Sequence, residues 1–189
     1  YLDRYDPAAL PAPVGDSGEL ENRTEVLRKA SQKSYAGNAR GFAESSREEI
    51  QQVVAANYAM VDLIDDEVAR MLEALDELGV AQNTVVVFTS DHGEMQGDHG
   101  LMLKGPMMYE GAVRVPLVMR WPQTVPAGQR IDGLVEWFDL GPTLLEVAGL
   151  EPLPGSQALS LLSLVQGEGE SLGRDWALCE YRDSGHPYD

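Results

Sequence analysis

The longest regular hydrophobic pattern in the chain predicts a helix of roughly eight turns that begins near Ser46. Glu49 follows Ser46 at the spacing of a capping box, in which each side chain accepts a hydrogen bond from the backbone N–H of the other residue. Gly79 stands where a left-handed residue would end the helix. The apolar positions recur at steps of three and four residues, so we expect them to pack into a core. They are Ile50, Val53, Val54, Asn57, Val61, Ile64, Val68, Met71, Leu72, Leu75 and Leu78.

Two apolar runs after this helix predict buried strands. Residues 84–89 form a continuous, largely β-branched run without alternation, typical of a strand buried on both faces in a parallel sheet flanked by helices. Residues 113–121 predict a second strand, with Pro116 near its start or on an edge because proline cannot donate to the ladder. Helices alternating with buried strands indicate an α/β fold.

Shorter elements are expected on either side of these. Residues 1–20 are rich in proline, glycine and aspartate and predict an extended segment laid over a surface or, alternatively, a frayed end. Asp139 is expected to cap a helix that runs through Val147 and stops at Gly149. The remaining predicted elements are a short helix over residues 24–33 followed by Gly37 and Gly41 as breakers, a short helix over residues 159–165, and a strand over residues 176–181.

Composition and charge exclude several classes of function. Hydrophobic residues make up 43% of the 189 residues and charged residues 24%, which is typical of a globular protein. Fourteen basic against 31 acidic residues give a net charge of −17, which disfavours nucleic acid and anionic membranes as partners. The sequence has no apolar run long enough for a transmembrane span. Its single cysteine, Cys179, excludes an internal disulfide and a multi-cysteine metal cluster.

The candidate chemistry follows the first predicted strand, at residues 89–106. Ligand sites of open α/β sheets lie beyond the carboxyl ends of the strands. Two Asp-His-Gly triplets occur here, seven residues apart, among glycines that let the backbone approach a ligand closely. A bend after the strand could aim Asp91 and His92 at one metal ion, although an Asp-His pair in a loop is more often a hydrogen-bonded cap. Two ligands do not hold a metal alone, so we expect further carboxylates from elsewhere.

Four segments together resemble the second half of the sulfatase family, within the alkaline phosphatase-like superfamily, over about residues 50–165. They are Val86-x-Phe88-Thr89-Ser90-Asp91-His92-Gly93-Glu94 with Gly97-Asp98-His99-Gly100 and Lys104; Asn57-Tyr58-Ala59-Met60-Val61-Asp62; Arg114-Val115-Pro116-Leu117-Val118; and Asp139-Leu140-Gly141-Pro142-Thr143-Leu144-Leu145 with Ala148-Gly149.

The resemblance implies a three-layer α/β/α fold with a mostly parallel sheet, of which this chain is the C-terminal part. Residues 1–45 would be an irregular lead-in, 46–165 the core and 166–189 the start of a C-terminal segment. Asp91 and His92 would bind a divalent metal, calcium first, with manganese or zinc as alternatives. Lys104 would contact the sulfate or phosphate oxygens and stabilise their charge. His99 is a candidate substrate contact, with structural hydrogen bonding inside the loop as the alternative.

The chain departs from the family pattern at the nucleophile. Sulfatases take a formylglycine nucleophile from a Cys/Ser-x-Pro-Ser-Arg segment, together with two further carboxylates near the N-terminus. No such segment occurs here, and Cys179 lies in a strand-like context that predicts a buried or edge thiol. We therefore expect a fragment that begins after the nucleophile and is inactive alone.

The favoured function is that of a metal-dependent sulfuric ester hydrolase for the parent protein. One alternative is a phosphonate or phosphodiester hydrolase of the same superfamily, and another is a non-catalytic module. A parallel sheet without its neighbours would expose an edge and an apolar patch, so we also expect the isolated chain to self-associate.

Overall fold

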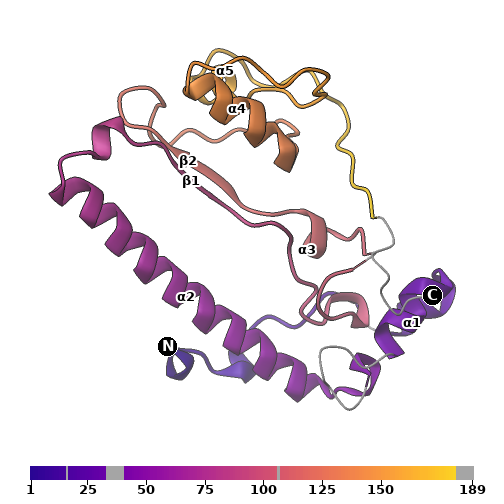
Figure 1. Cartoon of the computed structure of the whole chain (residues 1–189). Coiled ribbons are helices and arrows are strands. Elements are labelled where there is room, and N and C mark those ends of the chain that lie inside the picture. Colours follow the sequence, from indigo (N-terminus) through magenta and orange to yellow (C-terminus); the bar gives the residue numbers. More distant parts are fainter. Residues whose placement is uncertain (16, 33–40, 106, 182–189) are drawn as a thin grey trace. The chain divides into compact units, whose positions relative to one another are not determined.

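The computed structural model describes residues 1–15, 17–32, 41–105 and 107–181 (Figure 1). The chain divides into two compact units. The first contains Tyr1–Glu73 and His92–Val115, and the second contains Ala74–Asp91 and Pro116–Glu180. Within the described ranges, no helix combines the length and the apolar character needed to cross a membrane.

The long predicted helix is α2, Arg47–Glu77. Its capping box is confirmed, since the N–H of Ser46 donates to the carboxylate of Glu49 at 2.8 Å and the N–H of Glu49 donates to Oγ of Ser46 at 3.2 Å. Gly79 has a φ of +69°, the left-handed conformation predicted for the residue that ends the helix.

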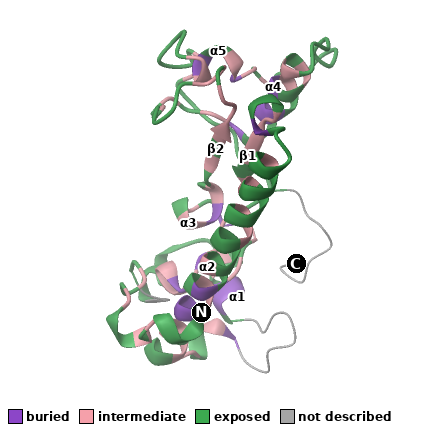
Figure 2. Cartoon of the chain, turned by 90° about the vertical axis from the view of Figure 1, so that its left-hand side faces the viewer, coloured by how far each residue is buried: buried purple, intermediate pink, exposed green. Residues whose placement is uncertain are grey.

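The apolar stripe of α2 is not packed into a core within the described chain. Val54 is buried, but Val61 is 62% and Met71 65% exposed, so the expectation of core packing is wrong for most of the stripe. Figure 2 shows α2 coloured mostly as exposed. The buried residues of α2 are Val54, Ala55 and Ala59, and only Val54 belongs to the predicted stripe.

The N-terminal segment contacts α2 and forms short turns rather than the extended chain predicted. The hydroxyl of Tyr1 donates to Asp66, and Arg4 and Tyr5 both donate to the carboxylate of Asp62, at 2.7–2.9 Å. The turns are the 3-10 helices η1 (Leu2–Arg4), η2 (Pro7–Ala9) and η3 (Ser17–Asn22).

The helix expected over residues 24–33 is α1, Glu25–Gln32. Lys33 and Gly37 lie outside the described residues, and Gly41 precedes a further 3-10 helix, η4 (Phe42–Glu44). The core of the first unit forms where α1 and η3 meet residues from the loop that follows His92. It consists of Leu20, Ala30, Met95, Leu101, Met107 and Ala112.

The described sheet has two strands, β1 (Val86–Thr89) and β2 (Leu117–Arg120), in the second unit. They are antiparallel, with Val86 opposite Arg120 and Thr89 opposite Leu117. The described pair therefore differs from the parallel sheet predicted, and β1 is only partly buried, with Phe88 exposed. Apolar composition predicted a strand correctly, whereas strand direction depends on partners that composition does not specify.

Two further predictions for the second half of the chain have different outcomes. Pro116 immediately precedes β2, which confirms its predicted place at the start of a strand. Residues 176–181 form no strand, and Cys179 is exposed rather than a buried or edge thiol. The other elements are the short helices η5 (Ala81–Asn83) and α3 (Glu110–Val113), the latter in the first unit.

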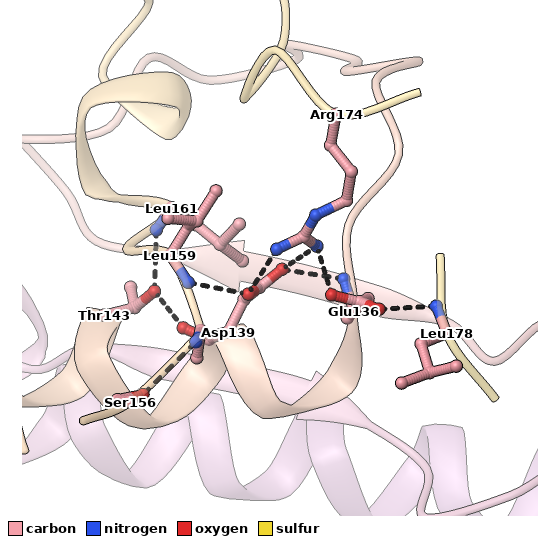
Figure 3. Close-up of polar contacts among 9 residues, drawn as sticks. Glu136, Asp139, Thr143, Ser156, Leu159, Leu161, Arg174 and Leu178 are labelled. Carbon is pink, nitrogen blue, oxygen red and sulfur yellow. Dashed lines mark hydrogen bonds and ion pairs between the residues drawn. The ribbon is translucent and has the colours of Figure 1, made fainter. Parts of the chain in front are cut away.

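Asp139 is the centre of a buried polar cluster in the second unit (Figure 3). It occupies the N-cap position of α4 (Leu140–Val147), and Gly149 ends that helix in the left-handed region, both as predicted. Its carboxylate does not cap the helix, however. It accepts from the N–H of Glu136 at 2.8 Å, the N–H of Leu159 at 2.9 Å and both terminal nitrogens of Arg174 at 2.7 and 3.1 Å.

Neighbouring polar atoms complete this cluster. Glu136 forms an ion pair with Arg174, with 2.9 Å between nitrogen and oxygen, and accepts a hydrogen bond from the N–H of Leu178 at 2.6 Å. Thr143 of α4 accepts from the N–H of Leu161, just before α5 (Leu162–Val165), the observed core of the predicted 159–165 helix. The side chains of Asp139, Glu136 and Arg174 are 0%, 6% and 8% exposed, so the ion pairs are shielded from water. The 3-10 helix η7 (Trp137–Asp139) sets the spacing between the two carboxylates.

We expect Asp139→Ala to lower the free energy of unfolding by about 3 kcal/mol, because the buried guanidinium of Arg174 loses its main partner. Urea unfolding measures this change. Asp132→Ala is the matched control, since Asp132 pairs with Arg130 at the surface, where an ion pair contributes little. Similar losses of unfolding free energy in both variants would contradict the role of Asp139 as the main partner of the buried Arg174.

Wild type and Asp139→Ala also test how the contribution of Asp139 to stability depends on pH. Burial alone would raise the pKa of Asp139, but hydrogen bonds from Arg174 and from backbone N–H groups outweigh it and leave the pKa below its ordinary value. A lowered pKa contributes stability above the unfolded value of about 3.9, and that stability is lost as the pH falls through the folded value. The stability difference between wild type and Asp139→Ala should therefore shrink on acidification below about pH 4. A difference that stays constant from pH 7 to pH 3 would argue against this.

Candidate metal and ester site

Asp91 and His92 lie directly beyond the end of β1, where the sequence predicted a metal-binding pair. Both side chains are exposed. Oγ of Ser90 lies 3.5 Å from Oδ1 of Asp91, and Nδ1 of His92 lies 2.9 Å from the carbonyl oxygen of Gly93. β1 is thus followed by a bend at Asp91, and the imidazole of His92 comes directly after this carboxylate in the chain.

The contact with Gly93 determines the tautomer of His92. A carbonyl oxygen can only accept, so Nδ1 of His92 carries the proton and donates it. In the neutral ring Nε2 is then the nitrogen with a lone pair, which is the form that binds a metal. Histidine ligands in metal sites commonly donate their other N–H to a carbonyl in this way.

The chain after His92 is anchored to α3 by its backbone. The N–H of Gly93 donates to the carbonyl of Ala112 at 2.8 Å, and that of Glu94 donates to the carbonyl of Gly111 at 2.9 Å. A Cβ on Gly93 would overlap the carbonyl oxygen of Gly111. Glycine is therefore required beside His92 by close approach of two backbones.

Residues 93–105, called the site loop below, fold back on themselves. The N–H of Met95 donates to the carbonyl of Leu103 at 3.0 Å near its base, and that of Gly97 to the carbonyl of Leu101 at 2.8 Å. The short 3-10 turn η6 (Asp98–Gly100) forms its tip. Three residues other than glycine adopt left-handed backbone conformations in this loop, which concentrates strain there as functional loops often do. They are Gln96, His99 and Leu103, with φ of 48°, 55° and 63°.

Lys104 lies at the base of the site loop and is exposed. The left-handed Leu103 precedes it directly, so the direction of the chain at Lys104 depends on that strained residue. Pro106, the end of the Lys-Gly-Pro sequence, lies outside the described residues.

His99 lies at the tip of the site loop and is held by several contacts. Its Nδ1 lies 2.9 Å from the carboxylate of Glu19, and its ring stacks on Tyr109 with centroids 4.4 Å apart. Its backbone N–H donates to the carbonyl of Val14 at 2.6 Å. Since Lys104 stands at the base of the loop, the two candidate substrate contacts occupy opposite ends of it.

No group of three or more histidine, cysteine, aspartate or glutamate side chains is arranged to hold a metal ion among the residues described. Asp91 and His92 supply one oxygen donor and one nitrogen donor. The pair fits part of a site for a divalent cation, and a complete site needs more ligands.

Comparison with known proteins decides the family. The sequence profile of the family described as Sulfatase matches residues 27–150, which include the site loop and the Asp91-His92 pair. The chain belongs to the sulfatase family. Its predicted membership is confirmed.

Two curated relatives of the sulfatase family align with nearly the whole chain. The chain is 32% identical to an arylsulfatase of Clostridium perfringens over 98% of its own length and 38% of that protein. It is 35% identical to a sulfatase of Formosa agariphila over 98% of its own length and 36% of that protein. The chain thus spans less than two fifths of the length of these relatives.

A solved structure supports the fold. The phosphonate monoester hydrolase of Agrobacterium radiobacter is 28% identical and superposes with a TM-score of 0.82, over 91% of this chain and 36% of that one. This similarity confirms an α/β fold of the alkaline phosphatase-like type.

The residues that hold the tip of the site loop could not be predicted from the sequence. Glu19 is 80 residues away from His99 along the chain, and Val14 donates its N–H to the carboxylate of Asp98 at 2.7 Å. Both belong to a segment whose composition indicated only an irregular lead-in. No local pattern in the sequence marks such distant contacts.

The close approach at Gly93 generates a prediction. We expect Gly93→Ala to lower the unfolding temperature by about 4–8 °C, because overpacking against backbone costs about 1–3 kcal/mol. Gly141→Ala is the matched control, since nothing lies within 4 Å of a Cβ at Gly141 in helix α4. Alanine at that helical position should leave the temperature unchanged or raise it. Calorimetry on both variants makes the comparison, and a neutral Gly93→Ala would contradict the packing argument.

Proposed function

We propose that the protein containing this chain is a metal-dependent hydrolase of sulfate esters. Asp91 and His92 are two of its metal ligands, and Lys104 contacts the ester oxygens. The observation that carries the proposal is the His92–Gly93 hydrogen bond. It prepares Nε2 to bind a cation beside the carboxylate of Asp91, in a chain of the sulfatase family.

The proposed cation would be calcium, with manganese or zinc as alternatives, and it would neutralise charge on the ester oxygens when bound. One carboxylate suits calcium, which prefers oxygen ligands, whereas the imidazole also suits manganese or zinc. The further ligands and a formylglycine nucleophile would come from residues outside this chain.

Lys104 would supply the fixed positive charge of the site. The sequence is strongly acidic, with a net charge of −17, so an anionic ester needs a local cation to overcome the surrounding field. The ammonium of Lys104 would lie against an ester oxygen and stabilise the negative charge that grows there as the bond to the leaving group breaks. Its exposed position at the base of the site loop leaves it accessible to a substrate.

We also propose that the whole catalytic domain is a three-layer α/β/α structure with a mostly parallel sheet. The antiparallel β1–β2 pair would be a minority arrangement in that sheet, as mixed sheets commonly contain. The exposed apolar side chains of α2 support a structure in which more chain covers this helix.

A second candidate is hydrolysis of phosphonate monoesters. It is favoured by the superposition on the Agrobacterium radiobacter enzyme, whose name states that activity. Sulfate and phosphonate esters both present anionic oxygens to a metal and a lysine, so the same residues would serve either substrate.

Turnover by the full-length protein tests the proposal. We expect metal-dependent hydrolysis of 4-nitrophenyl sulfate that chelation abolishes, and losses of about 100-fold or more in Asp91→Ala and Lys104→Ala. Asp132→Ala, at an exposed position in the second unit, is the control and should keep full activity. Preference for a phenylphosphonate monoester would select the second candidate. Absence of turnover of both esters by folded, metal-loaded protein would contradict the hydrolase proposal.

A further inference from the structure

We propose that Glu19 and His99 are positioning residues that hold the tip of the site loop and so fix the place of Lys104 at its base. The inference rests on the proposed function, in which Lys104 contacts the ester. It assigns His99 the structural role in the loop in place of direct contact with the substrate.

The tip is held by three polar contacts from one upstream segment. The imidazole of His99 donates from Nδ1 to the carboxylate of Glu19 at 2.9 Å. The backbone N–H of His99 donates to the carbonyl of Val14 at 2.6 Å, and the N–H of Val14 donates to the carboxylate of Asp98 at 2.7 Å. Two consecutive loop residues are therefore bound through both backbone and side chain.

Close packing supports these contacts. A Cβ on Gly15 would overlap the carboxylate of Glu19 and lie 3.0 Å from Nδ1 of His99, so the backbone at Gly15 covers the pair closely. Tyr109 stacks on the imidazole of His99, with 23° between the planes of the two rings. The imidazole is thus constrained by an aromatic ring, a carboxylate and a backbone turn.

The constraint reaches Lys104 through the loop itself. The hydrogen bonds from Gly97 to Leu101 and from Met95 to Leu103 join the two sides of the loop between its tip and its base. Met95 and Leu101 are fully buried in the core of the first unit, beside Leu20 of the same segment that carries Glu19. A loop that is paired and packed in this way moves as one body, so releasing its tip shifts its base.

The first experiment is independent of catalysis and measures hydrogen exchange of the loop amides in the full-length protein. Glu19→Ala should exchange the N–H groups of Gly97 and Leu101 at least about tenfold faster than wild type, because the tip is released. Glu21→Ala is the matched control on the same turn, since Glu21 is exposed, and should leave exchange unchanged. Unchanged protection in Glu19→Ala would overturn the inference even if no substrate were turned over.

The second experiment measures hydrolysis of 4-nitrophenyl sulfate by the same variants at a temperature where all are folded. Glu19→Ala should lower kcat about tenfold with the metal affinity unchanged, and Glu19→Gln should recover most of it because its amide oxygen still accepts from Nδ1. In a Lys104→Ala background, Glu19→Ala should cost less than about twofold, since the residue it acts through is gone.

The outcomes separate this inference from the proposed function. Turnover by wild type with Glu19→Ala as active as Glu21→Ala would overturn the positioning role alone. A weaker metal affinity in Glu19→Ala, or a full tenfold loss in the Lys104→Ala background, would show action through something other than Lys104 and would also overturn it. A wild type without turnover contradicts the hydrolase proposal, and the exchange measurement still decides whether Glu19 and His99 hold the loop.

Discussion

Backbone hydrogen bonding between residues 93–94 and α3 is the constraint on which the candidate site depends. It fixes the direction of the chain immediately after His92, and it leaves no room for a side chain at Gly93. The carbonyl of Gly93 then accepts the proton of Nδ1 and determines the tautomer of His92. A single glycine therefore connects local packing with the tautomer of His92, the proposed metal ligand.

The charged side chains of the Asp139 cluster in the second unit are buried and paired, whereas the candidate substrate-binding lysine of the first unit is exposed. In the second unit, one arginine pairs with two buried carboxylates, which also accept hydrogen bonds from backbone N–H groups, so Glu136, Asp139 and Arg174 serve structure. In the first unit, Lys104 is exposed and stands beside a strained loop residue, as expected of a charge that meets a substrate. Under the proposed function, the net charge of −17 would make this local cation, together with a bound metal, necessary for binding an anionic ester.

Local patterns in the sequence predicted local structure well. The capping box at Ser46, the left-handed Gly79 and Gly149 and the position of Pro116 all follow from the chemistry of single residues, and the structure confirms them. Features that depend on distant partners were wrong or missed. Asp139 stands at a helix N-cap, yet its carboxylate binds Arg174, 35 residues away, because a buried carboxylate without a charged partner would be strongly destabilising.

Strand direction and the contacts of the site loop have the same explanation. The apolar composition of β1 indicated a strand but not an antiparallel neighbour, and Glu19 reaches His99 across 80 residues of chain. The motif residues Asp91, His92 and Lys104 could be selected from sequence because their spacing resembles that of a family. Glu19 and Val14, which hold the tip of the site loop, could not be selected, since no motif contains them.

Anomalous diffraction from crystals of the full-length protein grown with manganese tests directly whether Asp91 and His92 bind a metal ion. We expect a peak for an ion that lies about 2.0–2.6 Å from a carboxylate oxygen of Asp91 and from Nε2 of His92. Nδ1 of His92 should still donate its hydrogen bond to the carbonyl oxygen of Gly93. A fully occupied ion held by other residues, with Asp91 and His92 outside its coordination sphere, would contradict this expectation.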